Sequence, residues 1–82
     1  MELIMSVHGE RFVEFLKAKL RERKGRIDGY KDTHFAVELG VEYTTLKRWL
    51  ALKSVERIDI ENYFSIEAVF KDEFTNFMKH GK

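Results

Sequence analysis

The stretch FAVELGVEYTTLKRWL, residues 35–50, has apolar and polar side chains at the spacing of two short helices joined by a turn. Gly40 stands at the turn, and the small Ala36 four residues earlier leaves room for the second helix to approach. The packing face comprises Phe35, Ala36, Leu39, Val41, Leu46, Trp49 and Leu50. The polar face comprises Tyr43, Thr44, Lys47 and Arg48. The spacing therefore predicts two helices folded against each other, with one buried and one polar side.

Length and composition set the scale of the rest of the molecule. The 82 residues predict a single domain spanning residues 1–82. The chain has no cysteine, so its core must come from aliphatic and aromatic packing, for which seven phenylalanines and Trp49 are available. The first residues, MELIMSVHGER, lack the basic start of a signal peptide, and the chain has no apolar run of membrane-spanning length. We expect a soluble protein of the cytoplasm.

The net charge of +1 conceals an uneven distribution. Residues 11–31 carry eight basic and three acidic side chains, and residues 43–57 carry four basic and one acidic. The acidic first half of the motif lies between these two blocks. Such asymmetry favours a nucleic-acid-binding face on one side of a small domain. For the first block, an ordinary solvated helix surface is an equally good explanation.

The remaining periodicity predicts an all-α fold, a compact bundle of four to five helices. Helically spaced Phe12, Phe15, Leu16 and Leu20 indicate a helix over about 9–24, ended by Gly25 and followed by a loop over 26–31. Asp32 is expected to be the N-cap of the next helix, which ends at Gly40. The third helix covers about 43–52.

The C-terminal part, residues 58–80, carries a long apolar stripe that predicts further helices. Either one helix runs from Asp59 to Phe70 and is followed by another, or a break occurs at Ser65, and the junction stays open. At the other end, Leu3, Met5 and Val7 alternate over too few residues to predict a strand. They are interpreted as an arm that packs on the core or on a partner.

A helix-turn-helix motif at residues 32–51 would place its second helix in the DNA major groove. The residues expected to read bases are Tyr43, Thr44 and Lys47. The residues expected to bind phosphates are Thr33, His34, Arg48 and Lys53. Glu42 precedes this helix and is interpreted as its cap.

On these residues the chain resembles the lambda-repressor-like helix-turn-helix domains, the Cro/repressor or XRE type of phage and prokaryotic regulators. The resemblance covers about Leu16 to Phe70, and it implies base reading at the start of the recognition helix and dimers on pseudo-palindromic operators. The family commonly has a threonine–glutamine pair where this chain has Lys31 and Asp32. Its first loop is usually shorter, and a glycine and a proline often follow the recognition helix, where this chain continues LALKSVERI.

The predicted function is a sequence-specific regulator of transcription, of the repressor type, bound to double-stranded DNA as a homodimer. Residues 58–80 are the candidate dimer surface. Two alternatives stay open. One is a protein-interaction module, such as an antitoxin or accessory factor, that captures a partner through Phe74 and Phe77; the other is a non-specific architectural DNA binder.

Other classes of function find little support in the sequence. His8, His34 and His80 lie too far apart for a metal site. The sequence has no recognisable glycine-rich phosphate loop, pair of catalytic carboxylates or Ser-His-Asp arrangement. We therefore expect no enzyme activity, cofactor, metal, small-molecule substrate or membrane partner.

Overall fold

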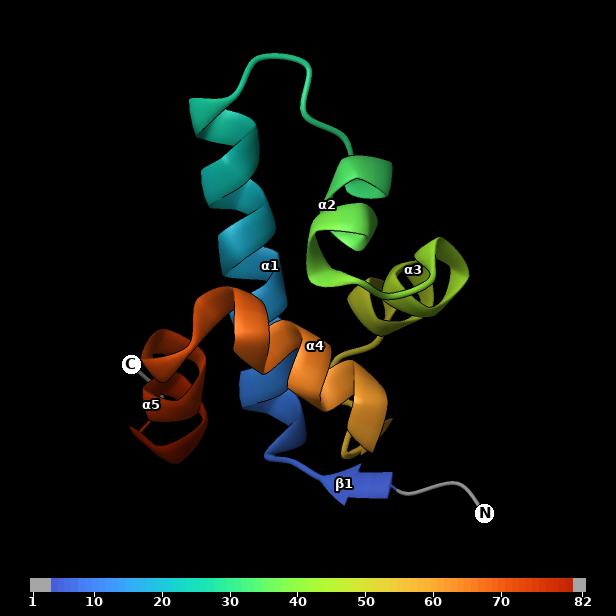
Figure 1. Ribbon diagram of the computed structural model, residues 1–82, viewed down its shortest axis with the longest axis vertical. Helices are drawn as coiled ribbons and strands as arrows, with labels where there is room; N and C mark the ends of the chain where they lie inside the picture. Colours follow the sequence, from blue (N-terminus) through green and yellow to red (C-terminus); the bar gives the residue numbers. More distant parts are fainter. Residues whose placement is uncertain (1–3, 81–82) are drawn as a thin grey trace.

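Residues 4–80 are described by a computed structural model, which has five helices and two short strands in that range. In chain order these are β1 (Ile4–Ser6), α1 (Gly9–Arg26), α2 (Asp32–Leu39), α3 (Tyr43–Ala51), β2 (Arg57–Asp59), α4 (Ile60–Phe70) and α5 (Asp72–His80). The long helix α1 lies between α2 and α3 on one side and α5 on the other, while α4 crosses its lower half (Figure 1). The predicted compact helical bundle is confirmed, with principal extents of 38 × 28 × 23 Å.

Aromatic side chains of α1 hold the other helices against it. Phe12 is fully buried. Its ring forms edge-to-face pairs with Trp49 of α3, with ring centroids 5.1 Å apart, and with Phe74 of α5, with centroids 6.3 Å apart. Phe15 makes a similar contact with Phe70 of α4 at 5.1 Å. Such edge-to-face pairs add to the gain from burying their apolar area. Trp49 is therefore a core residue, as the sequence indicated.

The turn between α2 and α3 has the geometry that the sequence predicted. Gly40 adopts the left-handed conformation, with φ 74° and ψ 30°. Its N–H donates to the Val37 carbonyl, and the N–H of Val41 donates to the carbonyl of Ala36, each at 3.1 Å. This pair of bonds is a Schellman motif, which satisfies the last carbonyls of a helix and reverses the chain. α3 then begins at Tyr43.

Two glycine-to-alanine substitutions should have opposite effects on stability. Gly40→Ala should lower the free energy of unfolding by about 1–2 kcal/mol, because an L side chain is strained in the left-handed region. Gly25→Ala should raise it by about 0.5–1 kcal/mol, because Gly25 is helical and has open space around it. Urea denaturation of both variants measures the two changes. An unchanged midpoint for Gly40→Ala would contradict the assigned turn.

The N-terminal arm packs Met5 and Val7 on the core, as one interpretation from sequence had it, and it also forms a strand, which the sequence did not predict. β1 pairs antiparallel with β2, and the half-buried Met5 lies opposite the buried Ile58. The N–H of Val7 donates to the Glu56 carbonyl at 2.8 Å and extends this pairing. Three residues of alternation carry little signal by themselves, and the pairing segment lies some fifty positions away. Leu3, part of the same alternation, lies outside the described residues.

The end of α1 also differs from the prediction. The helix passes through Gly25 and ends at Arg26, and the N–H of Ile27 donates to the Arg23 carbonyl at 2.8 Å. Basic side chains in the last turn favour this extension, because they interact well with the negative end of the helix dipole. The left-handed glycine of the loop is Gly29, with φ 79°.

Two further predictions concern helix starts and junctions. Asp32 is the first residue of α2 and not its N-cap, which is Lys31. Ser65 lies inside α4, so a break there is wrong. Asp59 caps α4 by accepting a hydrogen bond from the Glu61 N–H at 3.1 Å. The helix runs to Phe70, which confirms the alternative of one helix from Asp59 to Phe70 followed by another.

Candidate nucleic-acid interface

Helix α3 separates its apolar and polar side chains cleanly. Leu46 and Trp49 are buried against the core. The three residues predicted to read bases, Tyr43, Thr44 and Lys47, are all exposed to solvent. Because α3 starts at Tyr43, these side chains occupy its first two turns. The structure thus brings the predicted base-reading residues together on one exposed face.

The four predicted phosphate-binding residues are exposed as well, and they come from two neighbouring helices and the segment after them. Thr33 and His34 lie in the first turn of α2. Arg48 lies in the last turn of α3, and Lys53 follows that helix. α2 and α3 pack directly on each other, so both groups belong to one part of the molecule.

His34 has a structural role that the sequence did not indicate. Its ring Nδ1 accepts a hydrogen bond from the N–H of Lys31 at 2.9 Å and so caps the start of α2. The ring also lies beside Tyr30, with centroids 5.6 Å apart. Because Nδ1 is the acceptor, the neutral ring carries its proton on Nε2. That N–H remains a donor for a phosphate oxygen.

Glu42 occupies the N-cap position of α3, but its side chain does not act as a cap. Its carbonyl accepts from the Leu46 N–H at 3.0 Å, as in any first turn. Among the described residues, its carboxylate accepts no capping hydrogen bond. Asp, Asn, Ser and Thr are preferred there because their short side chains reach the free N–H groups. The expectation that Glu42 caps the helix is therefore correct for its position and wrong for its side chain.

The cations of this face differ from those packed within the bundle. Within residues 4–80, Lys47, Arg48 and Lys53 form no ion pair, whereas Lys19 and Arg23 of α1 both do. An unpaired cation on an exposed face has no internal salt bridge to break when an anion binds. The α3 face is therefore suited electrostatically to a polyanion.

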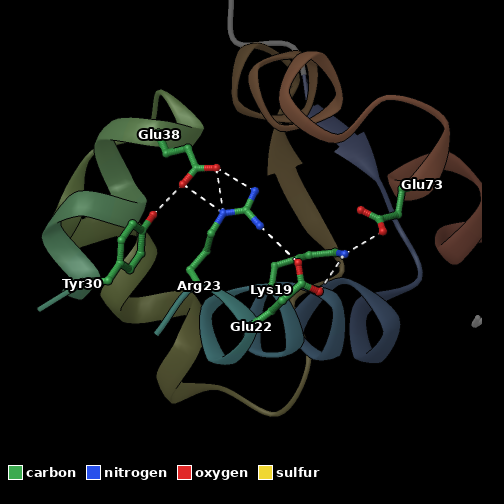
Figure 2. Close-up of polar contacts among 6 residues, drawn as sticks. All are labelled: Lys19, Glu22, Arg23, Tyr30, Glu38 and Glu73. Carbon is green, nitrogen blue, oxygen red and sulfur yellow. Dashed lines mark hydrogen bonds and ion pairs between the residues drawn. The ribbon is translucent and has the colours of Figure 1, made fainter. Parts of the chain in front are cut away.

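A polar network behind this face holds α2 against α1 (Figure 2). The Arg23 guanidinium donates to the Glu38 carboxylate, with Nη2 2.8 Å from Oε2. The Tyr30 hydroxyl donates to the other oxygen of the same carboxylate. On the same face of α1, Lys19 pairs with Glu73 of α5 at 2.6 Å, and Glu22 is ion-paired with both Lys19 and Arg23 (Figure 2). The sequence did not predict this network, because its members lie on separate elements and share no local pattern.

The network shifts the pKa of the Glu38 carboxyl and of the Tyr30 phenol, and the hydrogen bond to Glu38 also raises the pKa of Arg23. Hydrogen bonds from Arg23 hold the pKa of Glu38 below its ordinary value of 4.5. Burial, together with the hydrogen bond to Glu38, raises the pKa of Tyr30 to about 12. Both shifts favour the protonation states that the network uses, an ionised carboxylate and a neutral phenol. The network is therefore intact at neutral pH.

Glu38→Gln should destabilise the protein by about 1–2 kcal/mol at neutral pH, because it removes a charge-assisted bond that is only partly shielded from water. A carboxyl group whose pKa is lower in the folded than in the unfolded protein stabilises the fold at pH values above its unfolded-state pKa. This stabilisation is lost as the pH falls through its folded-state pKa. The difference in the free energy of unfolding between wild type and variant should therefore become smaller below pH 4.5. Urea denaturation at several pH values measures it. Glu56→Gln, exposed and without an ion pair in residues 4–80, is the control; an equal, pH-independent loss in both variants would contradict the assignment.

The C-terminal aromatic residues form mainly core. Phe74 is fully buried and meets Tyr63 edge-on at 5.3 Å, and Phe77 is half-buried. Phe74, one of the two side chains expected to contact a partner, is therefore part of the core, and capture of a partner by this region stays a prediction. The exposed aromatic side chain of this region is Phe64, at 52% exposure.

Comparison with protein-family models, curated proteins and solved structures finds no match to this chain. Within residues 4–80, no helix is both long and apolar enough to cross a membrane. In the same range, no group of three or more His, Asp or Glu side chains is gathered as metal ligands would be. The argument for a candidate nucleic-acid interface therefore depends on the geometry and charge of α2, α3 and the segment that follows α3.

Proposed function

We propose that the protein is a sequence-specific regulator of transcription, of the repressor type, with a lambda-repressor-like helix-turn-helix domain. In this proposal α3 enters the major groove of double-stranded DNA while α2 lies across the backbone. The main support is the polar face of α3. It is exposed, its cations form no ion pair with any residue from 4 to 80, and the other side of the helix is anchored by Leu46 and Trp49.

Each base-reading residue has a chemistry that suits a base edge. Lys47 can donate to O6 and N7 of guanine, and Thr44 can donate, accept or contact a thymine methyl group. Tyr43 offers a hydroxyl or the flat face of its ring. Packing of Leu46 and Trp49 fixes the helix that carries them. A rigid carrier favours recognition because less freedom is lost on binding.

The phosphate-binding residues flank this face. Arg48 and Lys53 supply charge, while Thr33 and the Nε2–H of His34 supply hydrogen bonds beside the free N–H groups at the start of α2. Contacts of this kind position a protein on DNA without reading its sequence. Affinity is therefore expected to fall steeply with salt.

A homodimer is part of the proposal, because a pseudo-palindromic site requires two α3 helices related by a twofold axis. The candidate surface lies on α4 and α5, where the exposed Phe64 borders a hollow shared with Lys71 and Asp72. Phe64→Ser should shift a dimer toward monomer in sedimentation equilibrium. An unchanged mass would place the dimer contact elsewhere.

The direct test is a selection from random duplexes, followed by anisotropy titration of the winner and of a scrambled duplex at two salt concentrations. Enrichment of one sequence supports the proposal. Tight, salt-dependent binding without enrichment would identify a non-specific architectural binder. The absence of any duplex binding would overturn the proposal.

The exposure of Phe64 keeps a protein-interaction module as the second candidate. An antitoxin or accessory factor would bind its partner through this side chain, and Phe64→Ser would then abolish capture of that partner. In that case substitutions at Lys47 and Arg48 would leave capture unchanged. DNA-binding measurements on the same variants separate the two candidates.

A further inference from the structure

Only some of the basic side chains of α1 form hydrogen bonds or ion pairs with other parts of the protein. The Arg11 guanidinium donates to the main-chain carbonyls of Met78 at 3.0 Å and Lys79 at 2.9 Å. Lys19 pairs with Glu73 of α5. These cations tie α1 to the C-terminal helix, on the side away from α3 (Figure 1).

Other cations of α1 are committed to α2. Arg23 binds Glu38, and Lys24 lies 2.9 Å from the Asp32 carboxylate. Arg26, at the end of α1, is close enough to Glu38 to lower the pKa of that carboxyl. All of these charges therefore have an acidic neighbour that offsets them.

Lys17 and Arg21 differ from the rest of the block. Both are exposed, and neither forms an ion pair with any residue in the range 4–80. They border a hollow of about 360 Å³ between α1, the start of α2 and the end of α3. Its full lining is Lys17, Leu20, Arg21, Lys24, Asp32 and Leu50.

This hollow adjoins the predicted DNA-binding face. Leu50 lies three residues after Lys47, so the two side chains share a flank of α3. Lys17 also borders a second hollow beside the end of α3, lined by Glu10, Val13, Glu14, Lys17, Ala51, Leu52 and Lys53. The cations Lys53, Lys17 and Arg21 thus form a strip along one flank of α3.

We propose that Lys17 and Arg21 bind phosphates of the DNA backbone beside the groove that α3 enters. This inference rests on the DNA-binding function proposed above and adds α1 to the contact surface. Each neutralised phosphate releases counterions and steepens the dependence of log K on log salt by about 0.9. Lys24 contributes less because Asp32 already offsets its charge. Glu14, on the same strip, opposes the binding.

The test measures salt dependence, because a phosphate contact changes the slope whatever the sequence of the DNA. Anisotropy titrations at several NaCl concentrations should give a slope shallower by about 0.9 for Arg21→Gln and by about 1.8 for Lys17→Gln/Arg21→Gln. Both changes should weaken cognate and random duplexes by the same factor. Glu14→Gln should tighten both. Lys79→Gln on α5 removes the same charge on the opposite side of α1 and should change neither slope nor affinity.

The outcomes separate this inference from the function on which it rests. If the wild type binds no duplex, both fail. If the wild type binds and Arg48→Ala weakens it, but the double variant keeps the wild-type slope, only the α1 strip is overturned. If Lys79→Gln lowers the slope as much as Arg21→Gln, the effect comes from net charge and the strip is again overturned. Urea midpoints of all variants confirm that each remains folded.

Discussion

Phe12→Ala should lower the free energy of unfolding by about 3–5 kcal/mol, the range measured for buried aromatic residues replaced by alanine. Phe12 is completely buried, and its ring contacts Trp49 of α3 and Phe74 of α5. Truncation removes both contacts and leaves a cavity where three helices meet. Domains of this kind have unfolding free energies of only about 5–15 kcal/mol, so the loss would remove between about one fifth and all of that stability.

The same substitution at Phe64 provides the matched control. Phe64 is 52% exposed, so Phe64→Ala should change the stability of the monomer by less than about 1 kcal/mol; measuring both variants at a protein concentration that keeps them monomeric excludes any effect on a dimer. Urea denaturation monitored by Trp49 fluorescence measures both variants. If Phe12→Ala is unfolded even without urea, Phe12→Leu, which keeps most of the volume, gives a smaller loss that can be measured. Equal losses at Phe12 and Phe64 would contradict the assigned core.

Lys47→Ala should reduce the preference for cognate over random DNA by about 1–3 kcal/mol, the value of one good contact between a side chain and a base edge. The side chain is exposed, so the fold should be unaffected. Arg48→Ala should instead weaken cognate and random DNA alike, because a phosphate contact carries no sequence information. Competition titrations of both duplexes against each variant measure the difference.

The pair of variants forms its own control, since both remove one exposed positive charge from α3. Equal loss on both duplexes for Lys47→Ala would reassign that residue to phosphate binding. If neither variant alters DNA binding while urea midpoints stay at the wild-type value, the recognition role of α3 is wrong.

Much of the fold could be predicted from sequence because the signals are local. The spacing of Phe35, Leu39 and Leu46 around Gly40 indicated two packed helices, and the structure has them with the glycine in the left-handed conformation. The exposure of Tyr43 and Lys47 followed from the same periodicity. The boundary of α1 was missed by two residues, because a glycine near a helix end need not be its cap.

The candidate site was predicted less completely. Its seven side chains are exposed as expected, but the cap formed by His34 and the missing cap at Glu42 depend on short-range geometry that residue type does not specify. The β1–β2 pairing joins segments about fifty residues apart. No window of sequence contains both of its strands.

The sequence by itself determined which faces of the helices are apolar, where the chain turns at Gly40 and which polar residues stand on α3, because periodicity and glycine conformation are properties of neighbouring residues. Only the tertiary structure decided which charged side chains form ion pairs. Arg23 and Lys17 stand on the same helix, yet one is bound to Glu38 and the other remains unpaired in the described residues. An ion pair depends on which distant segment folds against the charge, and that information arises only when the helices pack.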